Sequence, residues 1–249
     1  MFVAASTTCF PNLPLSDAFQ KLVDLEYSCT EIAIHEHGRQ FKPSEVVENL
    51  DRAIDICRNT HRLDVCSYNL KIDATDQEHY RQFAAICKLA KATKVVSITV
   101  PSAEVGTPFN QEVEHLRELV GIASVDGVRV STSSQLGRLS ADPDTVSVLC
   151  GNVKGLGLTF DPSHYICQPN AEVDAQKVIK YVYHVRLRDT SKEALQVRVG
   201  KGVVEFGRLL TQLRQVGYNR ALCVDITEMP EVDHMAEMRK MRLLLESLL

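Results

Sequence analysis

The chain lacks several features that would assign it to particular classes of protein. Its 249 residues carry a net charge of -4, so no overall basic field favours binding to nucleic acid or to an anionic membrane. No apolar run approaches the roughly 20 residues of a membrane-spanning helix. The first ten residues, MFVAASTTCF, lack the charged and apolar regions of a signal peptide. We therefore expect a soluble, cytoplasmic protein with no nucleic-acid or membrane partner.

Three chemical motifs are also missing. The eight cysteines contain no C-x-x-C pair, and we expect buried thiols in a reducing compartment. The residues after the first predicted strand, TTCFP, are not a Gly-rich phosphate loop. Ser163 stands beside His164 without the G-x-S-x-G elbow of a hydrolase, so a hydrolase triad is disfavoured.

Short β-branched runs alternate with longer amphipathic runs along the whole chain. We expect strands at residues 2–6, 30–35, 63–67, 95–99, 128–133, 156–161, 182–188 and 221–225. Helical patterns lie at residues 15–26, 44–61, 77–93, 111–125, 142–150, 173–180, 206–216 and 232–248. Strict alternation over this length predicts an α/β fold, a (β/α)8 TIM barrel formed as a single domain by residues 1–249. The alternative, an open α/β sheet, would favour the phosphate loop that is missing.

Polar residues follow the predicted strands where each strand ends. In a closed parallel barrel the active site lies at these carboxyl ends. The seventh strand is the clearest case, because His184, Arg186 and Arg188 alternate with Val185 and Leu187 and so form one cationic face. We expect the same mouth to collect His35, Ser133, Gln135, Asp161, His164 and Asp225, with Lys201 in a flexible Gly-Lys-Gly loop.

The chain resembles the xylose-isomerase-like family of sugar isomerases and epimerases over nearly its whole length, most specifically in its second half. The D-x-x-H of that family is present as Asp161 and His164, and its H-x-H-x-(K/R)-D strand resembles HVRLRD at residues 184–189. Its G-x-G, followed by a helix and Gly-Tyr, is similar to residues 200–202 and 217–218. The resemblance implies a divalent metal held by a Glu after strand five, the Asp after strand six, the second His of strand seven and a Glu after strand eight. It also implies that the two Glu residues shuttle a proton between sugar carbons.

Most of the metal ligands implied by this resemblance are substituted. Ser133 stands for the Glu of strand five, Arg186 for the second His of strand seven and Asp225 for the Glu of strand eight, so only Asp161 matches. A guanidinium has no lone pair to offer, and at 5 Å it repels a divalent ion by roughly 7 kcal/mol at an effective dielectric near 20. We expect no bound metal, with Arg186 in its place and paired with Asp161, and with Asp225 also within its reach.

Two hypotheses about the site follow from these substitutions. In the first, a metal-free pocket binds a polyol or an anionic sugar, with Arg186 and Arg188 facing a carboxylate or phosphate. Further contacts would come from Asp161, Ser133, Gln135, Lys201 and His35. In the second, Arg186 only neutralises Asp161 and no ligand binds. If the family site survives, Mn, Mg, Co or Zn would be held by Asp161 and Asp225. His35 and His37 could hold a relocated metal, although loop histidines are more often solvated.

Three classes of function remain. The first is a sugar or sugar phosphate isomerase or epimerase of carbohydrate metabolism, weak or metal-independent. Its general base would be Asp225, with His164 or His184 as acid and Arg186 as electrophile. The second is a non-catalytic sugar- or anion-binding protein on the same barrel. The third is an AP-endonuclease-like nuclease, which would need a zinc cluster and a basic groove that this acidic chain does not offer. The identity of the sugar and the oligomeric state stay open.

Overall fold

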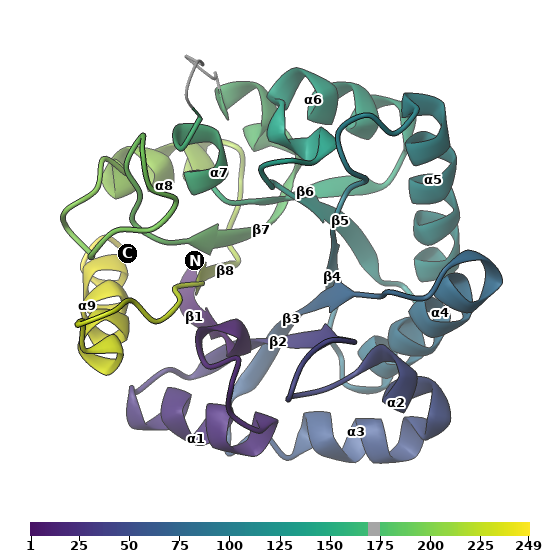
Figure 1. Ribbon diagram of the computed structural model, residues 1–249, viewed down its shortest axis with the longest axis horizontal. Coiled ribbons are helices and arrows are strands. Elements are labelled where there is room, and N and C mark those ends of the chain that lie inside the picture. The colour runs from purple at the N-terminus through teal and green to yellow at the C-terminus, as the bar shows by residue number, and fades with distance from the viewer. Residues whose placement is uncertain (169–174) are drawn as a thin grey trace.

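Eight parallel strands close into a barrel, as Figure 1 shows. A computed structural model describes residues 1–168 and 175–249. The strands are β1 (Phe2–Ser6), β2 (Cys29–His35), β3 (Asp64–Lys71), β4 (Ser97–Val100), β5 (Arg129–Ser133), β6 (Leu156–Phe160), β7 (Val182–Leu187) and β8 (Ala221–Val224). Each strand pairs with the next, and β8 pairs with β1 to close the ring. The (β/α)8 barrel predicted from the sequence is confirmed.

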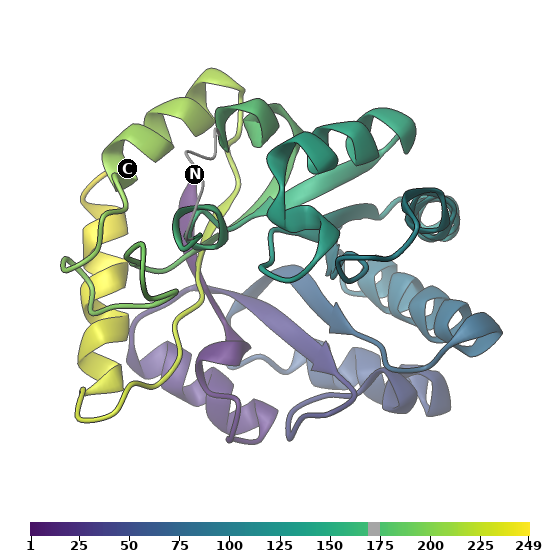
Figure 2. The same cartoon turned by 45° about the horizontal axis from the view of Figure 1, so that its top comes forward.

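Helices surround the barrel on its outer side (Figures 1 and 2). The outer helices are α1 (Leu15–Asp24), α2 (Pro43–Glu48), α3 (Leu50–Arg58), α4 (Asp76–Ala92), α5 (Phe109–Val125), α6 (Pro143–Asn152), α8 (Phe206–Gln215) and α9 (His234–Glu246), while the short α7 (Ser163–Ile166) follows β6 at the carboxyl end of the barrel. Three 3-10 turns complete the described elements: η1 (Thr7–Cys9), η2 (Leu139–Ala141) and η3 (Ala175–Tyr181). Within the described residues, no helix combines the length and the apolar character needed to cross a membrane.

The structure departs from the expected elements in three places. The helix expected over residues 44–61 is broken at Asn49, whose backbone leaves the helical region and whose side chain accepts from the Arg52 amide to cap α3. Strand β3 continues through Lys71, so residues expected in a loop belong to the strand. The helix expected at residues 173–180 lies partly outside the described residues, and its described part is the 3-10 turn η3.

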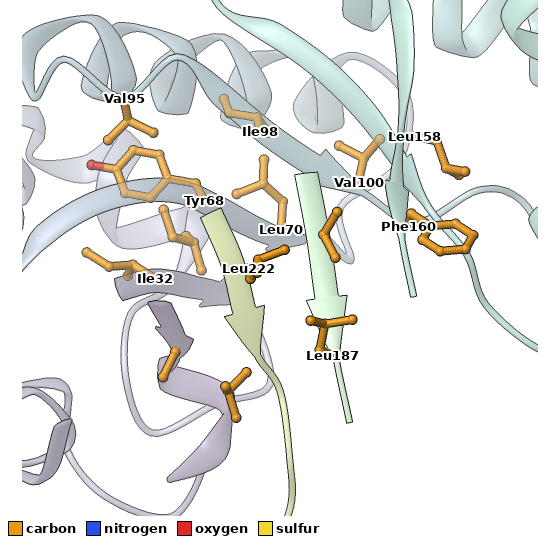
Figure 3. Close-up of a cluster of buried hydrophobic side chains, with 14 of the residues drawn as sticks. Ile32, Tyr68, Leu70, Val95, Ile98, Val100, Leu158, Phe160, Leu187 and Leu222 are labelled. Atoms are coloured by element: carbon orange, nitrogen blue, oxygen red, sulfur yellow. The ribbon is translucent and has the colours of Figure 1, made fainter. Parts of the chain in front are cut away.

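The apolar core lies between the strands and the helices. Side chains such as Ile32, Tyr68 and Ile98 point outward from the strands and belong to one large buried cluster (Figure 3). Burial of this apolar surface is the main favourable contribution to folding. All eight cysteines lie in the described part of the chain and are free thiols, and six of them are buried.

The inside of the barrel is polar, in contrast to the branched aliphatic layers usual for this architecture. Thr159 on β6 shares 2.7 Å hydrogen bonds with Ser131 on β5 and with Thr99 on β4. Strands β4 and β6 are not neighbours, so the Thr99 and Thr159 hydroxyls meet inside the ring. Small hydroxyl side chains at this level leave space above them for larger charged groups.

The loop after β7 is held by one buried carboxylate. Asp189 accepts from the backbone amides of Gly200 (2.8 Å), Gly202 (3.0 Å) and Thr190 (3.0 Å). A side chain at Gly202 would collide with this carboxylate, so the glycine is required by the close approach. Lys201, between the two glycines, is exposed.

We predict that Asp189→Ala destabilises the protein by about 1–3 kcal/mol, because buried amide donors lose their acceptor. Urea unfolding followed by circular dichroism would measure the loss. The matched control in the same loop is Lys201→Ala, which should change the unfolding free energy by less than about 0.5 kcal/mol. Equal effects of the two substitutions would contradict a structural role for Asp189.

Candidate functional site

A cavity of about 210 Å³ opens at the carboxyl ends of the strands. Eight of the residues predicted from the sequence line it: His35, Ser133, Gln135, Asp161, His164, Arg186, Arg188 and Asp225. Two predicted residues do not. His184 is buried beneath the cavity, and Lys201 lies outside it, because the Asp189 carboxylate holds its loop in another position. The wall also contains Asn69 and Lys71, which follow the third predicted strand, and Thr8, which sequence reasoning did not assign to the site.

Arg188 lies between the two carboxylates at the mouth. Its Nη2 atom is 3.1 Å from Asp161 Oδ2 and 2.8 Å from Asp225 Oδ2. The remaining oxygens are also bonded: Asp161 Oδ1 accepts from the amide and hydroxyl of Ser163, and Asp225 Oδ1 accepts from the Thr8 hydroxyl at 2.6 Å. All three charged side chains are nearly buried. Both carboxylates are therefore held rigidly by one guanidinium and short local hydrogen bonds.

The pKa of Asp225 reflects this pairing. Burial alone would raise the pKa of the carboxyl, but the guanidinium groups of Arg188 and Arg186 and the Thr8 hydroxyl outweigh burial and lower it. Asp225 is thus an ionised hydrogen-bond acceptor. A carboxylate with a lowered pKa is a weak base, which reduces its power to remove a proton from carbon.

Arg186 pairs with Glu31 across the barrel, one layer below the mouth. Its Nε and Nη2 atoms lie 3.0 and 2.9 Å from the two Glu31 oxygens, a bidentate geometry, and Glu31 is fully buried. His184 Nε2 lies 3.0 Å from Glu31 Oε2. Burial would raise the pKa of Glu31, but Arg186 and His184 outweigh it and hold the pKa well below its usual range.

The expected partners of Arg186 are therefore wrong. The pairing with Asp161 and Asp225 is made by Arg188, two residues further along and nearer the mouth. Sequence reasoning also missed Glu31. Alternation in the segment CTEIAIH places Glu31 on the same strand face as His35, which is the signal that could have found it.

The two cavity histidines are in different settings. His164 Nδ1 accepts from the Leu136 amide at 3.2 Å, so in the neutral ring the hydrogen sits on Nε2, which is 3.7 Å from Asp161 Oδ2. Burial lowers the pKa of His164 and favours this neutral form. His35 Nε2 is buried and has no hydrogen-bond partner among the described residues. Burial, Lys71 and Arg186 lower the pKa of His35 to about 4.

The residues at the family position do not fit a divalent metal. The space between Asp161 and Asp225 is filled by the Arg188 guanidinium, and the fifth strand ends in Ser133 without a carboxylate. A cation placed there would have to displace a permanently charged group. The relocated site on His35 and His37 also lacks support, because His37 is exposed and pairs with Asp73 at 3.2 Å.

One deeper group has the spacing of metal ligands. Among the described residues, the ligand atoms of Glu31, His184 and Cys223 all lie within 4.8 Å of one another. Both Glu31 oxygens are already bonded to Arg186, and burial holds the pKa of the Cys223 thiol well above its usual value. The trio therefore fits an ion pair better than a metal.

We predict that Glu31→Gln destabilises the protein by about 3–5 kcal/mol, because it leaves the Arg186 charge buried without a partner. Replacing both members, as Glu31→Leu with Arg186→Met, should recover most of the loss, since no unpaired charge remains. Equilibrium denaturation measures both. Glu78→Gln, in an exposed pair with Arg81 at 2.7 Å, is the control and should have a much smaller effect, because water screens exposed pairs. If Glu31→Gln lowers the free energy of unfolding no more than this control does, the buried Glu31–Arg186 pair does not stabilise the fold as predicted.

A family model and several solved structures match this chain over most of its length. The family model described as Xylose isomerase-like TIM barrel matches residues 19–246. No curated protein sequence matches the chain. Among solved structures, the chain is similar to 3-keto-D-glucoside 4-epimerase from E. coli, with 16% identity, 99% of each chain covered and a TM-score of 0.76.

Two further structures extend the comparison. A xylose isomerase-like TIM barrel protein from Mycobacterium smegmatis, in complex with magnesium, has 14% identity and a TM-score of 0.77, with 99% of this chain and 95% of that chain covered. D-Psicose 3-epimerase with D-tagatose, from Clostridium cellulolyticum, has 12% identity and a TM-score of 0.74, with 100% and 99% covered. Such low identities establish a shared fold, and the family match covers most of the sequence. The chain belongs to the xylose isomerase-like TIM barrel family.

Proposed function

We propose that this protein binds a small polyhydroxylated ligand of the sugar class in the cavity, without a divalent metal. The observation that carries the proposal is the position of Arg188, whose Nη2 atom bonds both Asp161 and Asp225 where the family resemblance places a metal. Sugar epimerases among the structural neighbours support the ligand class. An internal guanidinium gives both carboxylates a cationic partner and balances one of their two negative charges.

The composition of the wall supports recognition of hydroxyl groups. Asp161 and Asp225 offer acceptor oxygens, while His164 can donate from Nε2. Gln135 and Ser133 can each both donate and accept. A cavity of about 210 Å³ suits one small ligand, since pockets for drug-sized molecules start near 300 Å³.

A second candidate is a metal-independent isomerase or epimerase that uses the same cavity. Asp225 and His164 both line the cavity, which favours Asp225 as base and His164 as proton donor. His184 is buried beneath the cavity and cannot act as the acid that the sequence suggested. The Arg186 guanidinium donates from one edge to Glu31, which leaves its other edge for a ligand. Ser133 leaves the cavity without the second carboxylate that two-base epimerisation requires, so we expect weak turnover at most. The nuclease hypothesis gains no support from the described residues, whose one group with metal-ligand spacing is fully buried.

The first test measures metal and ligand binding together. The protein is purified without a chelator or an affinity tag, and its metals are measured by plasma mass spectrometry. We expect well under one metal per chain, and calorimetric binding of members of a polyol and sugar panel that is unchanged by EDTA. Near-stoichiometric metal that disappears in Asp161→Ala would overturn the proposal, and so would a panel with no binding member.

We further predict that Arg188→Met creates a weak Mn²⁺ site, because it frees two adjacent carboxylates. Electron paramagnetic resonance of added Mn²⁺, and a melting temperature that rises with Mn²⁺, would detect it. Lys71→Met is the matched control: it removes a positive charge from the cavity but leaves Arg188 on the carboxylates, so it should gain no Mn²⁺ binding. Mn²⁺ binding by the control, or none by Arg188→Met, would contradict the assignment of Arg188 as the group that blocks the metal.

A further inference from the structure

The cavity has one wall with an uncompensated positive charge. His35 and Lys71 end the neighbouring strands β2 and β3 and are direct partners in the sheet register. Asn69, two residues before Lys71, lines the same wall. We call these three residues the β2–β3 wall. Among the described residues, the Lys71 side chain has no ion-pair or hydrogen-bond partner, and it is exposed at the cavity rim.

The opposite wall has the reverse polarity. Asp161 and Asp225 carry two negative charges against the single charge of Arg188, so that wall keeps one negative charge in excess. Arg186 lines the cavity, but its charge is balanced by Glu31, which lies beneath the cavity. The cavity is therefore polarised, with positive charge on the β2–β3 wall and negative charge facing it.

We propose that the ligand is a sugar acid whose carboxylate binds at the β2–β3 wall, an inference that rests on the proposed function and names its substrate class. Lys71 supplies a full positive charge with three donors. His35 Nε2 is buried and has no hydrogen-bond partner among the described residues. In the tautomer that carries its hydrogen on Nε2, His35 would donate that hydrogen to the ligand carboxylate. The hydroxyl groups of the ligand then point to the acceptor oxygens of Asp161 and Asp225.

The charge balance favours a carboxylate over a phosphate. The wall holds one free cation, which matches a monoanion, whereas a phosphate dianion would leave one negative charge facing the neutral His35 ring. The pKa of His35, lowered to about 4, agrees with a wall that is already positive and that disfavours a second cation. Burial contributes first to that lowered value, and Lys71 and Arg186 follow.

The test compares matched acid and neutral ligands by calorimetry in EDTA at low salt. The pairs are D-gluconate with D-glucitol and D-glucuronate with D-glucose, and glucose 6-phosphate is added as the phosphate probe. We expect at least one acid to bind ten-fold or more tightly than its neutral partner, with a preference that weakens as salt rises. Lys71→Met should abolish the preference, while Lys71→Arg should retain it.

The control for Lys71→Met is Lys201→Met, an exposed lysine outside the cavity, which should keep the preference. Circular dichroism verifies that both variants fold, and Lys71→Gln provides a second removal of the charge. Equal binding of acid and neutral ligands, or a preference that survives in Lys71→Met, overturns the carboxylate assignment but leaves the proposed function standing. Tighter binding of glucose 6-phosphate than of the acids also overturns it. No binding by any probe overturns both.

Discussion

The structure depends on the pairing of charges inside a closed barrel. Glu31 is fully buried, and its ionised form is stable there only because Arg186 meets it with two hydrogen bonds and His184 lies beside it. A charge on one strand thus requires a partner three strands away around the ring, and this side-chain pair links β2 to β7, which share no backbone ladder. The small hydroxyl residues at the deeper level, such as Thr159, make room for these long side chains.

Arginine in place of a metal changes the properties of the two carboxylates at the mouth. A divalent ion can be exchanged, removed by a chelator or replaced by another metal, whereas a guanidinium is covalently fixed and always charged. It also polarises a ligand less strongly, because it carries half the charge and cannot accept a lone pair. In the proposed binding site, Asp161 and Asp225 are consequently better suited to hold hydroxyl groups than to assist the removal of a proton from carbon.

Sequence periodicity was enough to predict the barrel, but it could not pair the charges within it. Alternation located all eight strands, and the inward polar face of β7 was visible in the spacing of His184, Arg186 and Arg188. The partner of each arginine depends on depth along the barrel axis. Two residues on a strand differ in depth by about 6–7 Å, which is enough to move a guanidinium from Glu31 to Asp161. The depth of each side chain depends on the register between strands that are distant in sequence. The sequence pattern of one strand alone does not specify that register.

The same difference in charge between a metal and an arginine accounts for the polarity of the cavity. A divalent ion would balance both Asp161 and Asp225, whereas Arg188 balances one and leaves the other to be satisfied across the cavity. Lys71 lies on the far side, with its charge unpaired within the described residues. The Lys71 charge offsets the excess negative charge of the two carboxylates, but the two charges lie on different walls of the cavity. A ligand that matches this separation must carry a negative group at one end and hydrogen-bond donors at the other. The proposed preference for such a ligand would therefore rest on side chains of the protein itself and would not depend on the supply of any ion.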